Sequence, residues 1–183
     1  MIITKIEAQK RKERVNIYLD GDFSFGLDNQ LKIKYNLHQG MKVDKSFIEQ
    51  VLKDEELNKV IHSALNFLSY RQRSEKEIYD KLKQKGFNES DIETAIEYCK
   101  SKNYINDREF AISFINDKVN LNKFGSQRIK FELIRKGISQ NIIDEVLDLQ
   151  WEDEYDTALD LGRNKMYSYR DDDKLARYRK LGG

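Results

Sequence analysis

The chain has 183 residues, which is enough for one or two domains with a hydrophobic core, and it carries 33 basic against 32 acidic side chains. This near balance argues against a protein that coats DNA, because the affinity of such proteins depends on a large basic excess. Any contact with nucleic acid must therefore come from a local basic patch.

Residues 1–43 predict a small β module. Apolar and polar residues alternate on both sides of Asp20-Gly21-Asp22, which is typical of a β-hairpin with these three residues at its tip. Residues 2–8 predict a third strand, and Asp28 is placed to cap a short helix that runs through Tyr35. The expected cross-strand pairs, which place the apolar side chains on one face, are Leu19 with Phe23, Ile17 with Phe25 and Val15 with Leu27.

From Asp44 onward the apolar residues recur at the spacing of helices. Asp44 and Ser46 are expected capping residues of a linking helix. Ser74-Glu75-Lys76-Glu77 fits a capping box, in which the serine oxygen accepts one free amide and the glutamate reaches back to another. Residues 106–109 form a second box of this kind, and Asn88 and Ser139 are expected to cap two further helices.

Residues 64–96 and 111–147 share one apolar pattern, with a four-residue insertion in the second copy. Each copy predicts three helices, of which the second is short. We call these copies the first and second repeats. The matching positions are Ala64, Phe67, Leu68, Ile78, Leu82, Ile92, Ala95 and Ile96 in the first repeat and Ala111, Phe114, Ile115, Ile129, Leu133, Ile143, Val146 and Leu147 in the second.

In both repeats the second helix is expected to end at a Lys-Gly-apolar sequence, Lys85-Gly86-Phe87 or Lys136-Gly137-Ile138. A glycine just past a helix end adopts the left-handed conformation without steric cost, and the apolar residue packs back on the last turn. A lysine in the last turn also suits the negative end of the helix dipole. We therefore interpret Lys85 and Lys136 as helix-end lysines rather than ligand contacts.

Together these patterns predict a mainly α protein, with tandem three-helix repeats preceded by a small N-terminal β-hairpin or β-sheet module. A third copy is indicated by Ala158 and Leu161 at first-helix positions and by residues 171–181 as its second helix. The expected divisions are the β module at 1–43, a linking helix and first three-helix unit at 44–105, a second three-helix unit at 106–151, and an incomplete or divergent third unit at 152–183.

The order of the helix signals resembles the RecX family. The resemblance covers about residues 60–150. Residues 1–43 are similar to an N-terminal extension of some members, and the incomplete third unit departs from the family pattern. The stretches that carry the resemblance are Ser74-Glu75-Lys76-Glu77-Ile78 through Lys85-Gly86-Phe87, then Tyr104-Ile105-Asn106-Asp107-Arg108-Glu109-Phe110-Ala111, and then Gly125 to Ile138 with Glu132-Leu133-Ile134-Arg135-Lys136-Gly137-Ile138.

The resemblance implies a curved array of three-helix units that lies in the helical groove of the RecA–DNA filament on single-stranded DNA. There it would limit filament growth and inhibit ATP hydrolysis, strand exchange and coprotease activity. This would place the protein in DNA repair, DNA recombination and the SOS response. The partner would carry out the catalysis, so the resemblance implies a regulator.

The sequence shows no pattern of an enzyme. It contains no phosphate-binding glycine loop, no zinc-spaced Cys/His set and no nucleophile elbow. His38 and His62 lie far apart in the chain, and Cys99 continues an apolar stripe at helical spacing, which is typical of a small buried hydrophobe. Acidic runs at 54–56 and 171–173 are typical of solvated faces or helix starts. We expect no catalytic residue, no metal site and no cofactor.

Compartment is indicated by what the sequence lacks. No apolar run approaches the roughly 20 residues that a membrane-spanning helix needs. Residues 1–5 lack the charged-then-apolar order of a secretion signal. Cys99 is the one cysteine, which rules out a disulfide within the chain and suits a reducing compartment. We expect a cytoplasmic monomer that makes no contact with a membrane.

The binding candidates are basic residues outside caps and helical pairs. Lys81 and Lys136 follow Glu77 and Glu132 by four residues and are expected to pair with them. Our hypothesis is that the others line a common surface for phosphates or acidic groups, to which Arg128, Lys130 and Arg135 contribute most. The alternative is that they only keep the surface soluble. These candidates are Arg71, Arg73, Lys76, Lys83, Lys123, Arg128, Lys130 and Arg135.

Two functions remain open at this point. The first is a regulatory protein that binds the RecA filament, with at most weak direct contact to DNA. The alternative is a helix-turn-helix-like protein that acts directly on duplex DNA, because helix-turn-helix proteins also contain a three-helix unit with a short second helix. The near-neutral charge and the repetition of the unit within one chain favour the first.

Overall fold

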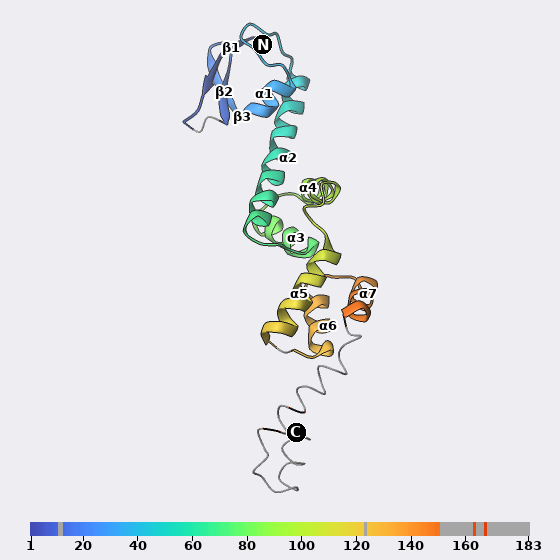
Figure 1. Cartoon of the computed structure of the whole chain (residues 1–183). Helices are drawn as coiled ribbons and strands as arrows, with labels where there is room; N and C mark the ends of the chain where they lie inside the picture. The colour runs from blue at the N-terminus through green and yellow to red at the C-terminus, as the bar shows by residue number, and fades with distance from the viewer. Residues whose placement is uncertain (11–12, 123, 151–162, 164–166, 168–183) are drawn as a thin grey trace. The chain divides into compact units, whose positions relative to one another are not determined.

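The computed structural model describes residues 1–10, 13–122, 124–150, 163 and 167, and it divides into two compact units after Asn106. None of the helices in these ranges is long and apolar enough to cross a membrane. The N-terminal unit consists of strands β1 (Ile3–Ala8), β2 (Arg14–Leu19) and β3 (Asp22–Asp28) and helices α1 (Asn29–Lys34), α2 (Lys45–Tyr70), α3 (Glu75–Gln84) and α4 (Glu89–Ser101) (Figure 1). The C-terminal unit contains α5 (Asp107–Asn122), α6 (Ser126–Arg135) and α7 (Gln140–Gln150).

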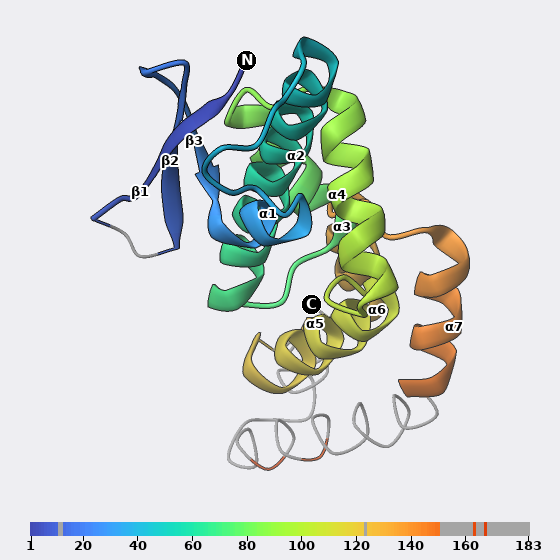
Figure 2. The same cartoon turned by 90° about the horizontal axis from the view of Figure 1, so that it is seen from above.

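The predicted β module is confirmed as an antiparallel sheet in the order β1-β2-β3. The pairs Val15 with Leu27 and Ile17 with Phe25 form as expected. Their side chains face α1 and the N-terminal part of α2, which cover one side of the sheet (Figure 2). The Asp28 side chain caps α1 by accepting the backbone N–H of Gln30 at 2.8 Å.

The predicted hairpin tip is wrong by one residue. The turn consists of Asp20-Gly21 alone, with φ values of 50° and 106°, so that Leu19 lies opposite Asp22 rather than opposite Phe23. Two-residue turns of positive φ match the twist of a hairpin, and the ladder recovers its register through a bulge next to Tyr18. Phe23 therefore lies on the outer face of the sheet, 58% exposed, with its ring centroid 5.8 Å from that of Tyr18.

Helix α2 is shared by the β module and the first repeat. It begins as predicted at Asp44, whose carboxylate accepts the Phe47 amide at 2.8 Å. Val51, in its N-terminal half, belongs to the core beneath the sheet. Val60 and Ala64, in its C-terminal half, belong to the core formed with α3 and α4. A single helix therefore joins the two cores of the N-terminal unit.

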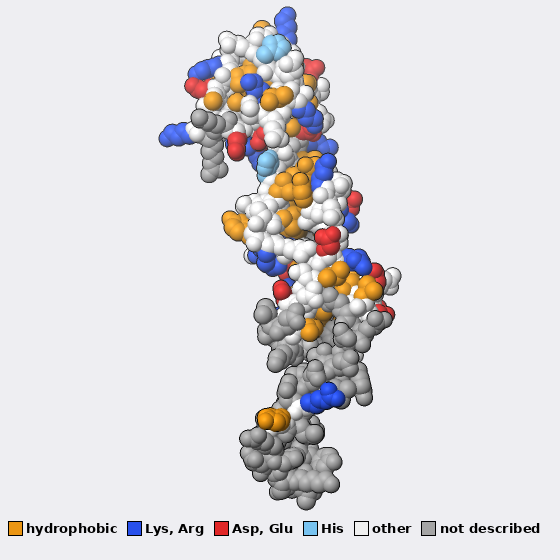
Figure 3. Space-filling model, viewed as in Figure 1, with side chains coloured by type: hydrophobic (Ala, Val, Ile, Leu, Met, Phe, Trp, Pro, Cys, Tyr) orange, Lys and Arg blue, Asp and Glu red, His pale blue; other side chains and the backbone are white. Residues whose placement is uncertain are grey.

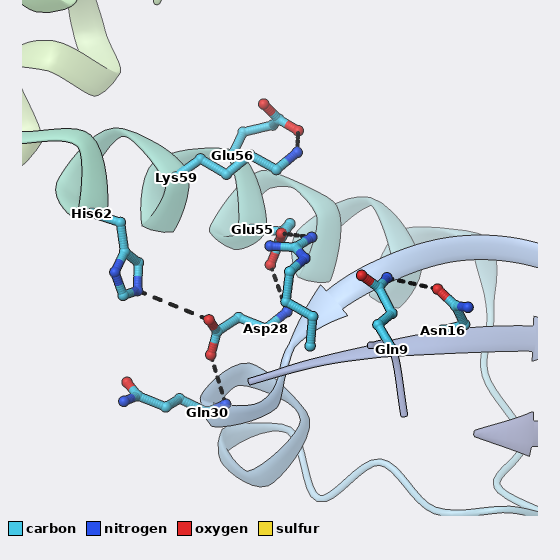
Figure 4. A network of polar contacts seen from close by, with 9 residues as sticks. Gln9, Asn16, Asp28, Gln30, Glu55, Glu56, Lys59 and His62 are labelled. Carbon is cyan, nitrogen blue, oxygen red and sulfur yellow. Dashed lines mark hydrogen bonds and ion pairs between the residues drawn. The ribbon is translucent and has the colours of Figure 1, made fainter. Parts of the chain in front are cut away.

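A buried ion pair fixes the sheet to α2 (Figure 4). Glu55 of α2 is only 2% exposed, and its carboxylate accepts hydrogen bonds from Arg14 Nη2 of β2 at 2.6 Å and from the Asp28 amide at 3.0 Å. The expectation of a solvated acidic run at 54–56 is therefore wrong at its central residue. The helix turns Glu55 toward the strands, which provide its partners.

The first repeat is the bundle of α2, α3 and α4. Ser74 caps α3 by accepting the Glu77 amide at 3.2 Å, and Asn88 caps α4 by accepting the Asp91 amide at 2.9 Å, both as predicted. Cys99 is fully buried in the shared core, as its position in the apolar stripe indicated. The core residues of this bundle are Val60, Ala64, Ile78, Leu82, Ile92, Ala95, Ile96, Cys99 and Ile105.

The second repeat, formed by α5, α6 and α7, has the same order of helices, and five matched positions on its three helices are buried in both repeats, which confirms the tandem repeat. The four-residue insertion lengthens the first helix, since α5 ends at Asn122 whereas the position that matches the end of α2 is Asp117. Helices α5 and α7 begin directly after the predicted caps Asn106 and Ser139. The core residues are Phe110, Ala111, Ile115, Ile129, Leu133, Ile138, Ile143 and Val146.

Both short helices end as the Lys-Gly-apolar sequence predicts. Gly86 and Gly137 have φ values of 84° and 82°. The amides of Phe87 and Ile138 return to the carbonyl oxygens five residues earlier, at 3.4 and 3.1 Å. This is the hydrogen-bond pattern of a Schellman motif, and it satisfies carbonyls that would otherwise lack a donor. The expected third copy, at Ala158, Leu161 and residues 171–181, lies outside the described residues.

Candidate interaction surface

Side chains that often carry chemistry are dispersed in this structure. The residues that the structure describes include no group of three His, Cys, Asp or Glu side chains that could hold a metal ion. His38 Nδ1 lies 2.9 Å from the carbonyl oxygen of Asn36, and His62 Nε2 lies 3.9 Å from the Asp28 carboxylate. Burial raises the pKa of the Cys99 thiol. On the face shown in Figure 3, basic and acidic side chains are interspersed over the β module and α2.

Two of the predicted basic residues hold the loop between α2 and α3. The Arg71 guanidinium donates to both carboxylate oxygens of Glu77, at 3.0 and 3.2 Å. Arg73 Nε donates to the carbonyl oxygen of Phe67 at 3.1 Å, and its guanidinium lies 5.9 Å from the centroid of the Phe67 ring. Both residues therefore have a structural role in the first repeat.

Two further candidates lie together on the outer face of α3. Lys76 binds Asp80 at 2.5 Å, one turn along the helix. Lys83 binds Glu89 of α4 at 2.7 Å, and this hydrogen bond raises the pKa of Lys83 and lowers that of Glu89. The basic charge of α3 is thus largely matched by acidic side chains of the same repeat.

The second repeat places its basic residues differently. Lys130 of α6 binds Asp144 of α7 at 2.9 Å, and the pKa of Asp144 is lowered by its hydrogen bonds, chiefly that from Gln140 and then that from Lys130. Arg128 stacks its guanidinium 3.6 Å from the centroid of the Phe124 ring. Arg135 is exposed and makes no ion pair with any residue that the structure describes. Lys123 lies outside the described residues.

The lysines at the two helix ends also contact aromatic rings of the preceding helix. The Lys85 ammonium lies 4.7 Å from the centroid of the Phe67 ring and donates to Ser63 Oγ at 2.7 Å. In the second repeat, the Lys136 ammonium lies 5.3 Å from the centroid of Phe114, the residue that matches Phe67. These lysines occupy the helix ends, as predicted, and they also pack the second helix against the first.

The predicted partners of Lys81 and Lys136 have other ion pairs in the structure. Glu77 binds Arg71, which comes from the preceding loop. Glu132 lies 3.7 Å from Lys118 of α5 and 3.8 Å from Arg128. Arg71 and Lys118 come from neighbouring segments, which a rule based on spacing along one helix does not capture.

The outer face of α6 exposes apolar side chains that the sequence reasoning overlooked. Phe131 is 70% exposed and Ile134 is 49% exposed, whereas Ile129 and Leu133 of the same helix are fully buried. The exposure of Phe131 follows from the periodicity of the helix. Phe131 lies two residues from each buried neighbour and so points to the opposite side of α6.

The third helix of each repeat has an acidic outer face. The single basic residue of α4, Lys100, lies 3.0 Å from Glu75 and 3.7 Å from Glu97, and α7 has no basic residue. Much of this acidic charge is balanced by ion pairs with Lys83, Lys100, Lys130 and Arg108, so neither helix presents the basic excess that insertion into a DNA groove needs. The exposed acidic side chains are Glu89, Glu93 and Glu97 of α4 and Asp144, Glu145 and Asp148 of α7.

Comparison with family models assigns the described parts of the chain in order. Residues 1–44 match the regulatory protein RecX N-terminal domain. Residues 61–99 match the first three-helix domain of RecX, and residues 106–147 match the second. The β module and both repeats thus each have a counterpart in the same family.

Known proteins and structures agree with this assignment. The chain is 42% identical to the regulatory protein RecX of Clostridium beijerinckii over 165 residues, which cover 89% of this chain and 76% of that protein. It is 38% identical to the regulatory protein RecX of Clostridioides difficile over 182 residues, or 98% and 85% of the two chains. A crystal structure of regulatory protein RecX superposes with a TM-score of 0.79 at 31% identity, covering 98% of this chain and 89% of that one. The crystal structure of RecX from Lactobacillus salivarius gives a TM-score of 0.62 at 29% identity, covering 70% and 84%. The chain therefore belongs to the RecX family of regulatory proteins.

Proposed function

We propose that this protein binds the RecA–DNA filament on single-stranded DNA and inhibits its recombinase, ATPase and coprotease activities. It acts as a cytoplasmic monomer in DNA recombination, DNA repair and the SOS response, and the filament carries out the catalysis. Family membership supports this proposal most directly, because the related proteins are named as regulatory proteins and their three domains match this chain in order.

The basic residues of the second repeat are the proposed contact site. Arg128 and Arg135 are exposed on α6, where Arg128 lies 3.8 Å from Glu132, whereas Lys76 and Lys83 of the corresponding helix α3 form ion pairs of 2.5 and 2.7 Å. Lys130 completes the set but is held by Asp144 in the free protein. A partner with acidic groups is therefore expected to contact Arg128 and Arg135 first, and Lys130 only after exchange of its ion pair.

The test measures ATP hydrolysis by the recombinase on single-stranded DNA with and without this protein. We expect the wild-type chain to lower the rate in a saturable manner. A variant with Arg128→Glu, Lys130→Glu and Arg135→Glu is expected to inhibit less while keeping the helical circular dichroism of the wild type. Intact inhibition by the folded triple variant would show that the contact site lies elsewhere.

A second titration separates this function from direct DNA binding. The helix-turn-helix-like alternative requires tight binding to a chosen duplex in the absence of recombinase, with a strong dependence on salt. The proposed function requires saturable binding to the nucleotide-bound filament. Tight duplex binding together with no binding to the filament would rule out the proposal.

A further inference from the structure

The outer face of α6 has the composition of a contact surface. Phe131 and Ile134 are 70% and 49% exposed, although both lie on a regular surface helix. The opposite face of α6 already supplies Ile129 and Leu133 to the core, so the exposed pair is not needed for the packing of the repeat. Grouped exposed apolar side chains in soluble proteins mark sites of interaction.

Two arginines flank this apolar pair. Arg128 precedes Phe131 by three residues and Arg135 follows it by four, so both lie on the same side of the helix as Phe131. The Arg128 side chain is 65% exposed while its guanidinium stacks on Phe124 and lies 3.8 Å from Glu132. Stacking of this kind holds the guanidinium in place and leaves its edge available to an acidic group.

The first repeat lacks this surface. The positions on α3 that match Phe131 and Ile134 are Asp80 and Lys83. Both take part in ion pairs, Asp80 with Lys76 and Lys83 with Glu89. The exposed apolar pair is therefore a property of the second repeat and not a requirement of the three-helix fold.

We propose that the outer face of α6 binds an acidic protein segment with an apolar anchor, and that this segment belongs to the recombinase; the inference thus rests on the proposed function. The anchor packs on Phe131 and Ile134, and carboxylates of the segment pair with Arg128 and Arg135. Charge decides against a nucleic-acid strand as the occupant. The neighbouring helix α7 has no basic residue, and its exposed Asp144 and Glu145 form ion pairs with Lys130 and Arg108, so the surface beside α6 carries no basic excess for a phosphate backbone.

The test compares two phenylalanine-to-serine variants of the full chain. Phe131→Ser removes the centre of the surface, and Phe23→Ser removes a similarly exposed ring of the β sheet as a matched control. Binding is measured by fluorescence anisotropy of labelled protein, with recombinase filaments assembled on single-stranded DNA with a non-hydrolysable ATP analogue. We expect Phe131→Ser to bind about tenfold or more weakly, as for a central interface residue, and Phe23→Ser to stay within about twofold of wild type.

A parallel titration with the single-stranded oligonucleotide alone identifies the occupant. The inference requires that Phe131→Ser leave this binding unchanged. An equal loss for the oligonucleotide and the filament would make the face a base-stacking platform and overturn the inference. A change in the sedimentation of the free variant would make the face a contact between copies of this chain, and the inference would be overturned in that case too.

The two proposals fail in distinguishable ways. If wild-type protein does not bind the filament, both the proposed function and this inference are wrong. If wild type binds and folded Phe131→Ser binds equally well, only this inference is wrong. Arg135→Glu provides a second variant, independent of any effect of Phe131→Ser on folding, and the inference requires it also to weaken filament binding about tenfold.

Discussion

The substitution Glu55→Gln tests whether the buried ion pair fixes the β module to α2. The Glu55 carboxylate accepts from the Arg14 guanidinium and from the Asp28 amide, and water has almost no access to it. Glutamine has nearly the same size but carries no charge and only one acceptor oxygen. One of the two donors must therefore lose its partner or share it.

The structure sets the magnitude of the effect. Removing one partner of a fully buried ion pair costs about 3–5 kcal/mol of unfolding free energy. The Arg14 side chain is 29% exposed, so water solvates part of its charge once Glu55 is neutral. The remaining amide oxygen also keeps one hydrogen bond. We therefore expect Glu55→Gln to lower the free energy of unfolding by about 2–3 kcal/mol.

Urea unfolding followed by circular dichroism at neutral pH measures this change. Glu56→Gln is the matched control, because Glu56 is the next residue of α2, is exposed and pairs only with Lys59 at 2.6 Å at the surface. The control is expected to cost less than about 1 kcal/mol. Hydrogen exchange of the Asp28 amide should accelerate in Glu55→Gln and not in Glu56→Gln. Equal unfolding free energies for the two variants would refute the assigned role of Glu55.

Three other predictions concern helix ends. Gly86 has a φ of 84°, and an added Cβ would meet no neighbouring atom, so Gly86→Ala is expected to cost about 1 kcal/mol of unfolding free energy through backbone strain alone. Gly125 has a φ of −73°, so Gly125→Ala is expected to cost well under about 1 kcal/mol. Urea unfolding measures both. The pKa of the Asp44 carboxyl is lowered from 3.8, chiefly by the hydrogen bond from the Phe47 backbone amide. The ionised carboxylate therefore stabilises the folded protein fully above a pH of 3.8, and this stabilisation is lost as the pH falls through the lower pKa of the folded state. Asp44→Asn should therefore lose less stability than wild type between about pH 5 and about pH 3, and equal losses would contradict this. Lys136→Met removes the contact with two rings of α5 and should cost about 1 kcal/mol by thermal unfolding, whereas Lys81→Met should be near neutral.

Local signals in the sequence predicted most of the helical architecture. The caps at Asp44, Ser74 and Asn88 and the Lys-Gly-apolar ends depend on contacts within a few residues, so their chemistry can be read along the chain. The repeat was also predictable, because the same apolar pattern recurs in both copies. The register of the hairpin near Phe23 could not be predicted, because the bulge adds a residue without changing the alternation of apolar and polar residues in the sequence.

The candidate site was less predictable for a related reason. Basic residues could be named from the sequence, but their partners come from other segments. Arg71 reaches across a loop to Glu77, and Lys130 reaches α7. Only the folded arrangement shows which charges are neutralised within a repeat. The exposure of Phe131 could have been predicted, because its place two residues from Ile129 and Leu133 already sets it outside the core.

The continuity of α2 limits how the N-terminal unit can move. Its 26 residues span about 39 Å at the rise of an α-helix, with the sheet against one half and α3 and α4 against the other. Bending such a rod in its middle would break several main-chain hydrogen bonds as well as the contacts on both sides. The β module and the first repeat should therefore tumble in solution as one rigid body. If both bind the same larger assembly, the distance between their two binding positions must be constant.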